Sequence, residues 1–452
     1  MKMENDLGHD RISRLVLRIA LPSMLAQFVS VLYSIVDRMF VGNIPGVGPE
    51  SLAGVGVCGP IVTMIGAFAF LVGIGGTPLM GIALGEGNKE KASSILANCF
   101  VMLCAISVVV TGLALAFREP MLRLFGASEV TYPYAEAYFS VYVMGTVFAL
   151  LSIGMYQFVI AQGYAKVGMC SVILGAVLNI ILDPVFIYVF HMGVRGAATA
   201  TVISQAASAA FVILFLLGRA HITISFGGYS YKIMLRVLKM GVTPFMIIAA
   251  DNIMLITMNA LLQKHGGANG DTLITVNTIV QSFMLVMTMP LGGISGGTQC
   301  ILSYNYGAGF SDRVLKAQRY IAAMCAGYTA ILFVLARVAG GAFASLFTAD
   351  AAIKEQACWA IRVCTLIAVP LGVQYSIVDG FTGMGQIQMS FPLSFWRKAV
   401  YFVAVFLIPT VAEAHMIFYA EPISDVLSVL VSIPVYLFSI KKILSKREKK
   451  LA

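Results

Sequence analysis

Long, unbroken apolar segments constrain this chain more than any other feature of its sequence. The first, near residues 14–42, contains one proline, Pro22, and one acid, Asp37. A helix needs about 20 apolar residues to cross a bilayer, and a backbone in lipid must form a helix or a closed barrel. Barrel strands alternate apolar and polar residues over about ten positions, whereas these segments are continuously apolar. With 11% charged residues, against about 25% in soluble domains, an all-α polytopic membrane protein is predicted.

The lengths of the apolar segments predict twelve transmembrane helices joined by short loops. We expect these helices near residues 14–42, 52–84, 95–117, 136–160, 167–190, 194–218, 235–263, 273–306, 317–346, 357–382, 391–412 and 416–440. A short polar arm, residues 1–13, precedes them, and a basic tail, residues 441–452, follows them.

The second half of the chain repeats the first at a constant offset in residue number, which we call the repeat offset. The offset that separates Pro22 from Pro244 also separates Asp37 from Asn259, so only the first copy keeps the acid. Six helices per copy insert both copies in the same sense, which predicts two parallel six-helix repeats with a cavity between them. The expected units are residues 14–218 and 235–440, joined by a cytoplasmic linker at residues 219–234.

The formal net charge of +9 suggests nucleic acid as a partner only in a soluble protein. Here the basic residues gather in alternate loops, as the positive-inside rule describes. Both chain ends are basic, so we expect both termini on the cytoplasmic side of the inner membrane, and no nucleic-acid partner.

Asp37 is the first candidate functional residue, because a carboxylate inside a membrane helix is costly and usually functional. One alternative is an interfacial acid paired with Arg38. Adjacent residues point about 100° apart on a helix, however, so they pair poorly. The other interpretation is an inward-facing cation or proton site.

The fifth and sixth expected helices supply polar partners for Asp37. Asn179 and Asp183 are four residues apart and therefore share one helix face, and Thr199 and Thr201 add hydroxyl groups. Carboxylate, amide and hydroxyl oxygens suit a hard cation such as Na⁺, or a shared proton. A purely structural polar cluster between helices is the alternative.

Several motifs together resemble the multidrug and toxic compound extrusion (MATE) family over nearly the whole chain. They are the first helix with its proline and acid, the run NIILDPVFIY, the run GVRGAATATVISQ and the segment NYGAG. The resemblance implies a V-shaped pair of six-helix lobes, N-lobe and C-lobe, that exports organic cations in exchange for Na⁺ or H⁺. It also implies an N-lobe cation site at Asp37, Asn179, Asp183 and Thr201, with Thr199 as a substitute.

The C-lobe offers two acids that can attract a cationic substrate, Asp251 and Asp379. Each can instead form an ion pair within the lobe, for instance with Arg397. Gln157, which precedes Asp379 by the repeat offset, is a weaker cavity candidate. Thioether and aromatic side chains suit varied flat cations, although most of them only pack. The remaining cavity candidates are Asn259, Met24, Met64, Met155 and Met284.

Taken together, these features predict a secondary multidrug antiporter for amphipathic organic cations, with Na⁺ or H⁺ as the coupling ion. Ion binding at Asp37 and Asp183 is expected to reposition the first helix about a hinge at Pro22. No cofactor is expected, no metal beyond Na⁺, and a monomer is sufficient for this mechanism.

Three other functions are weighed against an antiporter. A lipid-linked oligosaccharide flippase would line its cavity with basic residues for pyrophosphate, whereas the inward charges found here are mostly acids. An enzyme is disfavoured because the chain has no nucleophile–base or metal constellation. An uncoupled channel is disfavoured by the repeat and the paired acids.

Overall fold

The computed structural model describes residues 5–451, except for the side chains of Ala268 and Asp271. Residues 1–4 of the expected arm lie outside this range. The described part is helical and contains no strand. Its helices are α1 (Ile12–Gly42), α2 (Gly48–Gly85), α3 (Lys89–Ala116), α4 (Arg118–Leu124), α5 (Tyr132–Met144), α6 (Thr146–Ala161), α7 (Ala165–Pro184), α8 (Val194–Gly218), α9 (Tyr231–Gly266), α10 (Gly270–Gly297), α11 (Gln299–Gly307), α12 (Ser311–Val338), α13 (Gly340–Ala344), α14 (Ala351–Cys364), α15 (Ala368–Gly383), α16 (Ile387–Val411) and α17 (Ala420–Leu451).

The twelve-helix fold predicted from the apolar segments is confirmed. Within residues 5–451, ten helices are long and apolar enough to cross a membrane, and two bent pairs bring the number to twelve. The pair α5 and α6 bends by 58°, and the pair α14 and α15 bends by 50°. The first bend lies at Gly145 and the second at residues 365–367. The repeat offset relates these two positions, so both halves contain the same interruption.

The helix boundaries differ from the expected ones most clearly at the end of the chain. The last helix was expected to stop near residue 440, but α17 continues to Leu451. Lysine, leucine, arginine and glutamate, which fill this stretch, are all good helix formers. The expected basic tail is therefore the last part of α17.

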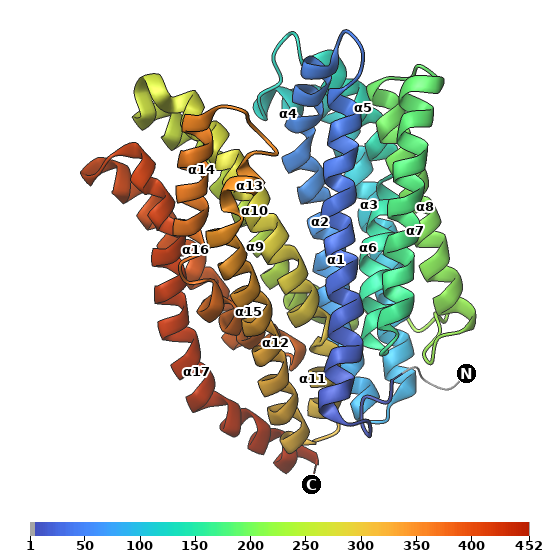
Figure 1. Cartoon of the computed structure of the whole chain (residues 1–452). Coiled ribbons are helices and arrows are strands. Elements are labelled where there is room, and N and C mark those ends of the chain that lie inside the picture. The colour runs from blue at the N-terminus through green and yellow to red at the C-terminus, as the bar shows by residue number, and fades with distance from the viewer. Residues whose placement is uncertain (1–4, 452) are drawn as a thin grey trace.

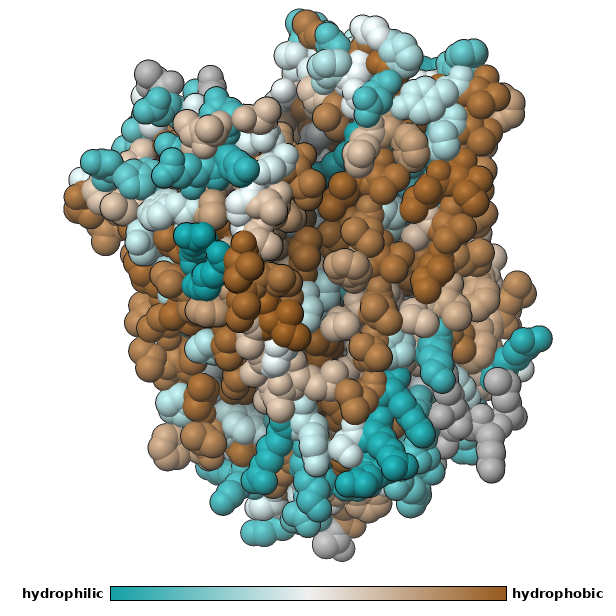
Figure 2. Space-filling view, viewed as in Figure 1, coloured by the Kyte–Doolittle hydropathy of each residue, from teal (hydrophilic) through white to brown (hydrophobic). Residues whose placement is uncertain are grey.

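Figure 1 shows the helices in two groups, one from each half of the chain, that spread apart toward one end of the molecule. Residues 5–10 and the last turns of α17 lie at the opposite end, where the groups meet. We call these the open end and the closed end. Apolar residues form a wide middle zone in Figure 2, polar residues gather at both ends, and the surface is hollowed between the groups at the open end.

The two halves are joined by crossed packing of their first two helices, α1 against α10 and α2 against α9. A Cβ atom on Gly293 or Gly297 of α10 would lie only 2.7 or 2.5 Å from atoms of Ser23 in α1. A Cβ on Gly75 of α2, the repeat equivalent of Gly297, would lie 2.4 Å from the Val237 carbonyl oxygen of α9. Small residues thus let the helices of opposite halves approach closely at equivalent positions.

At the closed end, α2 crosses α11 through residues that the repeat offset also relates. A Cβ on Gly81 would lie 2.0 Å from the hydroxyl of Ser303, and one on Gly85 would lie 2.9 Å from the Cα of Gly307. Ser303 and Gly307 are the repeat equivalents of Gly81 and Gly85. The pseudo-two-fold axis that relates the halves therefore passes through this crossing, which closes the floor of the space between them.

Candidate functional site

A polar cluster in the N-terminal half lies between α1, α7 and α8. The carboxyl groups of Asp37 and Asp183 are within hydrogen-bonding reach of each other. The amide nitrogen of Asn179 donates to Asp183 Oδ1 at 3.2 Å and to Thr201 Oγ1 at 3.4 Å. Asn179 and Asp183 are buried, with 2% and 0% of their surfaces exposed. The structure thus brings together the four residues that the sequence singles out.

The local sequence explains how α7 presents its two polar side chains. The i, i+4 spacing of Asn179 and Asp183 directs both toward α1 and α8. Pro184 ends the α-helix and has no amide hydrogen to donate, and residues 185–189 continue as a π-helical turn, a feature often found at functional sites. Within that turn, Tyr188 donates its hydroxyl to the carbonyl of Phe40 at 2.7 Å, which ties α1 to α7 beside Asp37.

Four buried side-chain oxygens of this cluster have no hydrogen-bond donor among the described residues. They are Asp37 Oδ1, Asn179 Oδ1, Asp183 Oδ2 and Gln205 Oε1. An ionised carboxylate accepts hydrogen bonds but cannot donate one, and two carboxylates in contact cannot both remain charged without compensation. A proton or a hard cation such as Na⁺ would satisfy these oxygens, because hard cations prefer oxygen ligands. The donor set fits either ion.

Thr199 does not join this cluster. Its hydroxyl donates to the carbonyl of Arg195 on its own helix at 2.7 Å. Thr201 also bonds its own helix, at the carbonyl of Ala197, but its oxygen faces Asn179 as well. Only the second threonine is therefore positioned to bind an ion with the acids.

Sequence reasoning missed Tyr33, Tyr142 and Gln205. Tyr33 is half-buried close to both acids, and Tyr142 lies within reach of the Gln205 side chain at the edge of the cluster. Helical spacing could have indicated two of them. Tyr33 precedes Asp37 by four residues and Gln205 follows Thr201 by four, so each shares a helix face with a candidate residue. Tyr142 gave no such signal, since it lies on α5 and reaches the cluster through tertiary packing.

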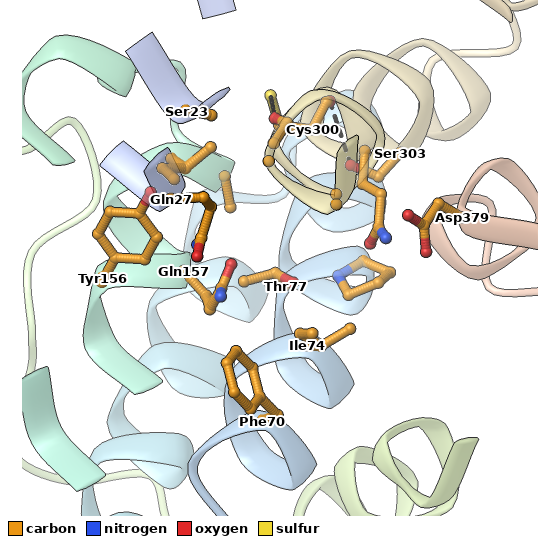
Figure 3. A pocket seen from close by; sticks show the side chains of 18 of the residues that line it. Ser23, Gln27, Phe70, Ile74, Thr77, Tyr156, Gln157, Cys300, Ser303 and Asp379 are labelled. Atoms are coloured by element: carbon orange, nitrogen blue, oxygen red, sulfur yellow. Dashed lines mark hydrogen bonds between the residues drawn. The ribbon is translucent and has the colours of Figure 1, made fainter. Parts of the chain in front are cut away.

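A second site is a cavity of about 220 Å³ between the two halves. It is lined by α1, α2 and α6 from the first half, and by α10, α11 and α15 from the second. Figure 3 shows Gln27 and Gln157 on the side of the first half and Asp379 approaching from α15. Asp379 is the one acid among the lining residues, none of which is a lysine or arginine. The cavity is therefore mainly apolar, with amides and a single carboxylate.

Asp379 is held in place by neighbours on the second half. Its Oδ2 accepts a hydrogen bond from the Ser295 hydroxyl at 2.5 Å, and Gln299 also bonds its side chain. Gln157, the other sequence candidate in the cavity, is the repeat equivalent of Asp379. Equivalent positions of the two halves thus face one cavity, and only one of them carries an acid.

The other polar candidates lie outside this cavity. Asp251, with 51% of its side chain exposed, forms an ion pair with Lys398. Asn259 accepts a hydrogen bond from the Asn277 amide at 2.8 Å. Both contacts are internal to the second half.

Arg397, which the sequence offered as a partner for Asp251 or Asp379, contacts neither of them in an ion pair. It pairs instead with Glu421 at 2.8 Å and Asp425 at 2.7 Å, both on α17. These three charges and the pair of Asp251 with Lys398 connect α16 to its neighbours within the second half.

The four methionine candidates are likewise absent from the cavity lining. Met155 and Met284 are buried in the cores of the first and second halves. Met24 packs against the core that joins the two halves, and Met64 is half-buried. The methionine that does line the cavity is Met289.

Pro22 lies inside α1, which continues as an α-helix on both sides of it. The residue is buried and directly precedes Ser23, which lines the cavity. A proline here removes one helix hydrogen bond and therefore weakens α1 locally. The expected hinge therefore lies at the level of the cavity, whereas Asp37 lies further along the same helix.

Comparisons with known proteins agree with this architecture. The family model described as MatE matches residues 22–185 and 247–408, one segment in each half. The multidrug export protein MepA of Staphylococcus haemolyticus (strain JCSC1435) is 24% identical over 381 residues, covering 83% of this chain and 81% of the relative. MepA of Staphylococcus aureus (strain MRSA252) is 24% identical over 386 residues, with coverage of 83% and 81%.

Two solved structures share the fold. One is an outward-facing multidrug resistance MATE family transporter of the MOP superfamily, with a TM-score of 0.91 and 22% identity. The other is a MOP superfamily transporter from Pyrococcus furiosus, with a TM-score of 0.91 and 23% identity. Each alignment covers 98% of this chain and 99% of the solved chain.

The two threonines of α8 provide a matched test of the candidate ion site. Thr201→Val removes a hydroxyl that faces Asn179, a loss of roughly 1 kcal/mol, so the ion concentration needed for a given increase in melting temperature should be about fivefold to tenfold higher. Thr199→Val should leave that concentration unchanged. The measurement is the melting temperature of the purified protein against Na⁺ concentration, and separately against pH. The same ion dependence of the melting temperature in both variants would contradict a role for Thr201 as an ion ligand.

Proposed function

Because the chain belongs to the MatE family, the multidrug and toxic compound extrusion transporters, we propose that it exports amphipathic organic cations by antiport with Na⁺ or H⁺. The observation that carries this proposal is the contact between Asp37 and Asp183 inside the membrane-spanning part of the first half. Two carboxyl groups in such a place need a proton or a cation. A reversible ion site is what coupling to an ion gradient requires.

The coupling ion binds among Asp37, Asn179, Asp183 and Thr201. Its ligands are the oxygens that lack donors, together with the Thr201 hydroxyl. Tyr33 and Gln205 complete the wall of the site. The same oxygens can bind Na⁺ or H⁺, so the efflux experiment below is needed to identify the coupling ion.

The substrate binds in the cavity between the halves. Asp379 attracts its positive charge, Phe70 and Tyr156 provide aromatic surface, and Gln27 and Gln157 offer amide groups. Aromatic faces and carboxylates both favour cations. The relatives are multidrug export proteins named MepA, and that activity fits a cavity that is mostly apolar and has few directional contacts.

The alternative function, flipping of a lipid-linked oligosaccharide or another amphiphile, fits this cavity less well. A pyrophosphate group calls for arginine or lysine, and neither lines the cavity. An acid at position 379 would repel such a substrate.

Helix α1 couples the two sites. On one side it packs against α7, where Asp37 faces Asp183, and on the other it packs against α10 of the second half. Ser23 and Gln27 of the same helix line the cavity. An ion that repositions α1, with Pro22 as its hinge, therefore changes the cavity, and export follows if ion and substrate prefer opposite-facing states.

The placement in the membrane follows from charge. The closed end carries Lys91, Arg313 and the lysines at the end of α17, so by the positive-inside rule it faces the cytoplasm. Both ends of the chain would then be on the cytoplasmic side of the inner membrane. The two lobes are those expected from the sequence, residues 14–218 and 235–440, except that α9 already begins at Tyr231 within the expected linker of residues 219–234 and α17 extends the second lobe to Leu451. A monomer carries both sites.

Efflux from proteoliposomes tests the ion site. Ethidium efflux by the intact protein should be driven by either an imposed Na⁺ gradient or an imposed pH gradient. Asp37→Asn should reduce the gradient-driven rate at least tenfold, because the amide neither titrates nor neutralises a cation. Asp312→Asn, an exposed acid at the start of α12, is the control. Normal transport by Asp37→Asn under both gradients would refute the proposed coupling site.

Asp379→Asn tests the substrate site separately. Loss of the carboxylate removes a charge-assisted contact, commonly about 1.5–3 kcal/mol, so the KM for ethidium should increase roughly tenfold or more. Dependence on the ion gradient should remain, and the KM for a neutral amphipathic substrate should change little. An unchanged KM for ethidium would exclude Asp379 from cation recognition.

A further inference from the structure

The last turns of α17 bring one arginine back to the closed end of the first half. Arg447, with 8% of its side chain exposed, donates from Nη2 to Glu86 Oε1 at 2.8 Å. Glu86 directly follows α2, and its other oxygen accepts from Lys91 Nζ at 2.9 Å. The guanidinium therefore reaches across from the second half to the turn between α2 and α3.

The same guanidinium also holds the second half. Arg447 Nη2 donates to the carbonyl of Gly307 at 2.7 Å, and Nε donates to the carbonyl of Tyr306 at 3.1 Å. These carbonyls lie at the end of α11, where α2 and α11 cross on the pseudo-two-fold axis. One side chain thus connects three segments, from both halves, at the point where the halves meet.

The sequence of α17 presents this arginine selectively. Ile440, Leu444 and Arg447 are buried and recur at helical spacing on one face. The neighbouring lysines, by contrast, are exposed: Lys441, Lys442, Lys446, Lys449 and Lys450. Arginine also has the planar set of donors that binds a carboxylate and two carbonyls at once, which lysine lacks.

A second connection lies beside it, in the segment before α1. The Asn5 amide donates to the carbonyl of Gly163 in the first half at 2.8 Å. Two residues later, the carbonyl of Leu7 accepts from Asn305 at 2.9 Å and from Arg313 at 3.2 Å, both in the second half. The chain before α1 therefore bridges the two halves as well.

The neighbours of Glu86 in its ion pair with Arg447 favour the ionised carboxylate. Glu86 lies outside the membrane-spanning segments; burial raises its pKa, but hydrogen bonds from Arg447 and Lys91 outweigh burial and lower it below its usual value. Glu86 is thus ionised at neutral pH, and the bond to Arg447 is a charge-assisted one.

We propose that Arg447 and Glu86 form a latch that holds the closed end shut, and that release of this latch is a required step when the transporter opens to that side. The proposal rests on the alternating access of the proposed function. It adds a control element that contacts neither the ion site nor the cavity: the strength of the latch sets the balance between the two facing states. The bridge from Asn5 to Leu7 supports the same closure.

Hydrogen exchange of the purified, full-length protein tests the latch without substrate or ion gradient. Arg447→Gln should accelerate amide exchange at least tenfold in residues 84–92 and 303–313, because the closed end opens more often. Lys446→Gln, an exposed neighbour, is the matched control. Exchange at the open end, for example in residues 126–131, should not change.

Glu86→Gln removes the other partner of the latch. Its control is Glu90→Gln, which changes an exposed acid in the first turn of α3. Glu86→Gln should accelerate exchange in the same two segments as Arg447→Gln. Two results would overturn the latch: exchange equal to that of the controls, or a uniform acceleration over all helices with a lower melting temperature, which indicates a purely structural role. Neither result bears on ion coupling, so failure of the latch and failure of the antiport proposal are distinguishable.

Discussion

The contact between two carboxyl groups inside the membrane is the constraint on which the rest of this structure depends. Charges in a medium of low dielectric repel strongly, and an uncompensated buried carboxylate is costly. Asp37 and Asp183 therefore require one proton or cation, and the oxygens without donors around them are the ligands we propose for it. Because the acids come from α1 and α7, we propose that the occupancy of this site sets how closely these two helices associate.

The crossed packing of the two halves connects the ion site of the first half to the cavity between the halves. Helix α1 belongs to the first half but packs against α10 of the second, and α9 packs against α2 in return. Small residues such as Gly75 and Gly297 bring these helices into close contact across the two halves. In the proposed mechanism, a movement of α1 at the ion site is transmitted to the cavity, while the crossing of α2 and α11 closes the opposite end.

The fold was predictable from the sequence because its signals are local or periodic. Segment length indicated twelve spans, and the offset between Pro22 and Pro244 indicated two copies. Spacing also paired Asn179 with Asp183 and suggested the sixth-helix threonines as partners for Asp37, but only the family resemblance favoured Thr201 over Thr199. Tertiary packing decides which face of an apolar helix points into the cavity. The positions of the methionine candidates and the partner of Asp251 could therefore not be predicted. The end of α17 has a clear basic pattern. The contact of its Arg447 with Glu86, 361 residues away, could not be predicted, because no sequence spacing relates two residues so far apart.

The most direct test of the account is the thermodynamic coupling between ion and substrate in the purified protein. Ethidium affinity would be measured by fluorescence titration, with and without Na⁺ at fixed pH, and at several pH values without Na⁺. The account predicts that the coupling ion weakens ethidium binding about tenfold or more, and that ethidium weakens ion binding by the same factor. It further predicts that this dependence disappears in Asp37→Asn. An ethidium affinity that is the same at every Na⁺ concentration and pH would contradict the coupling of the two sites.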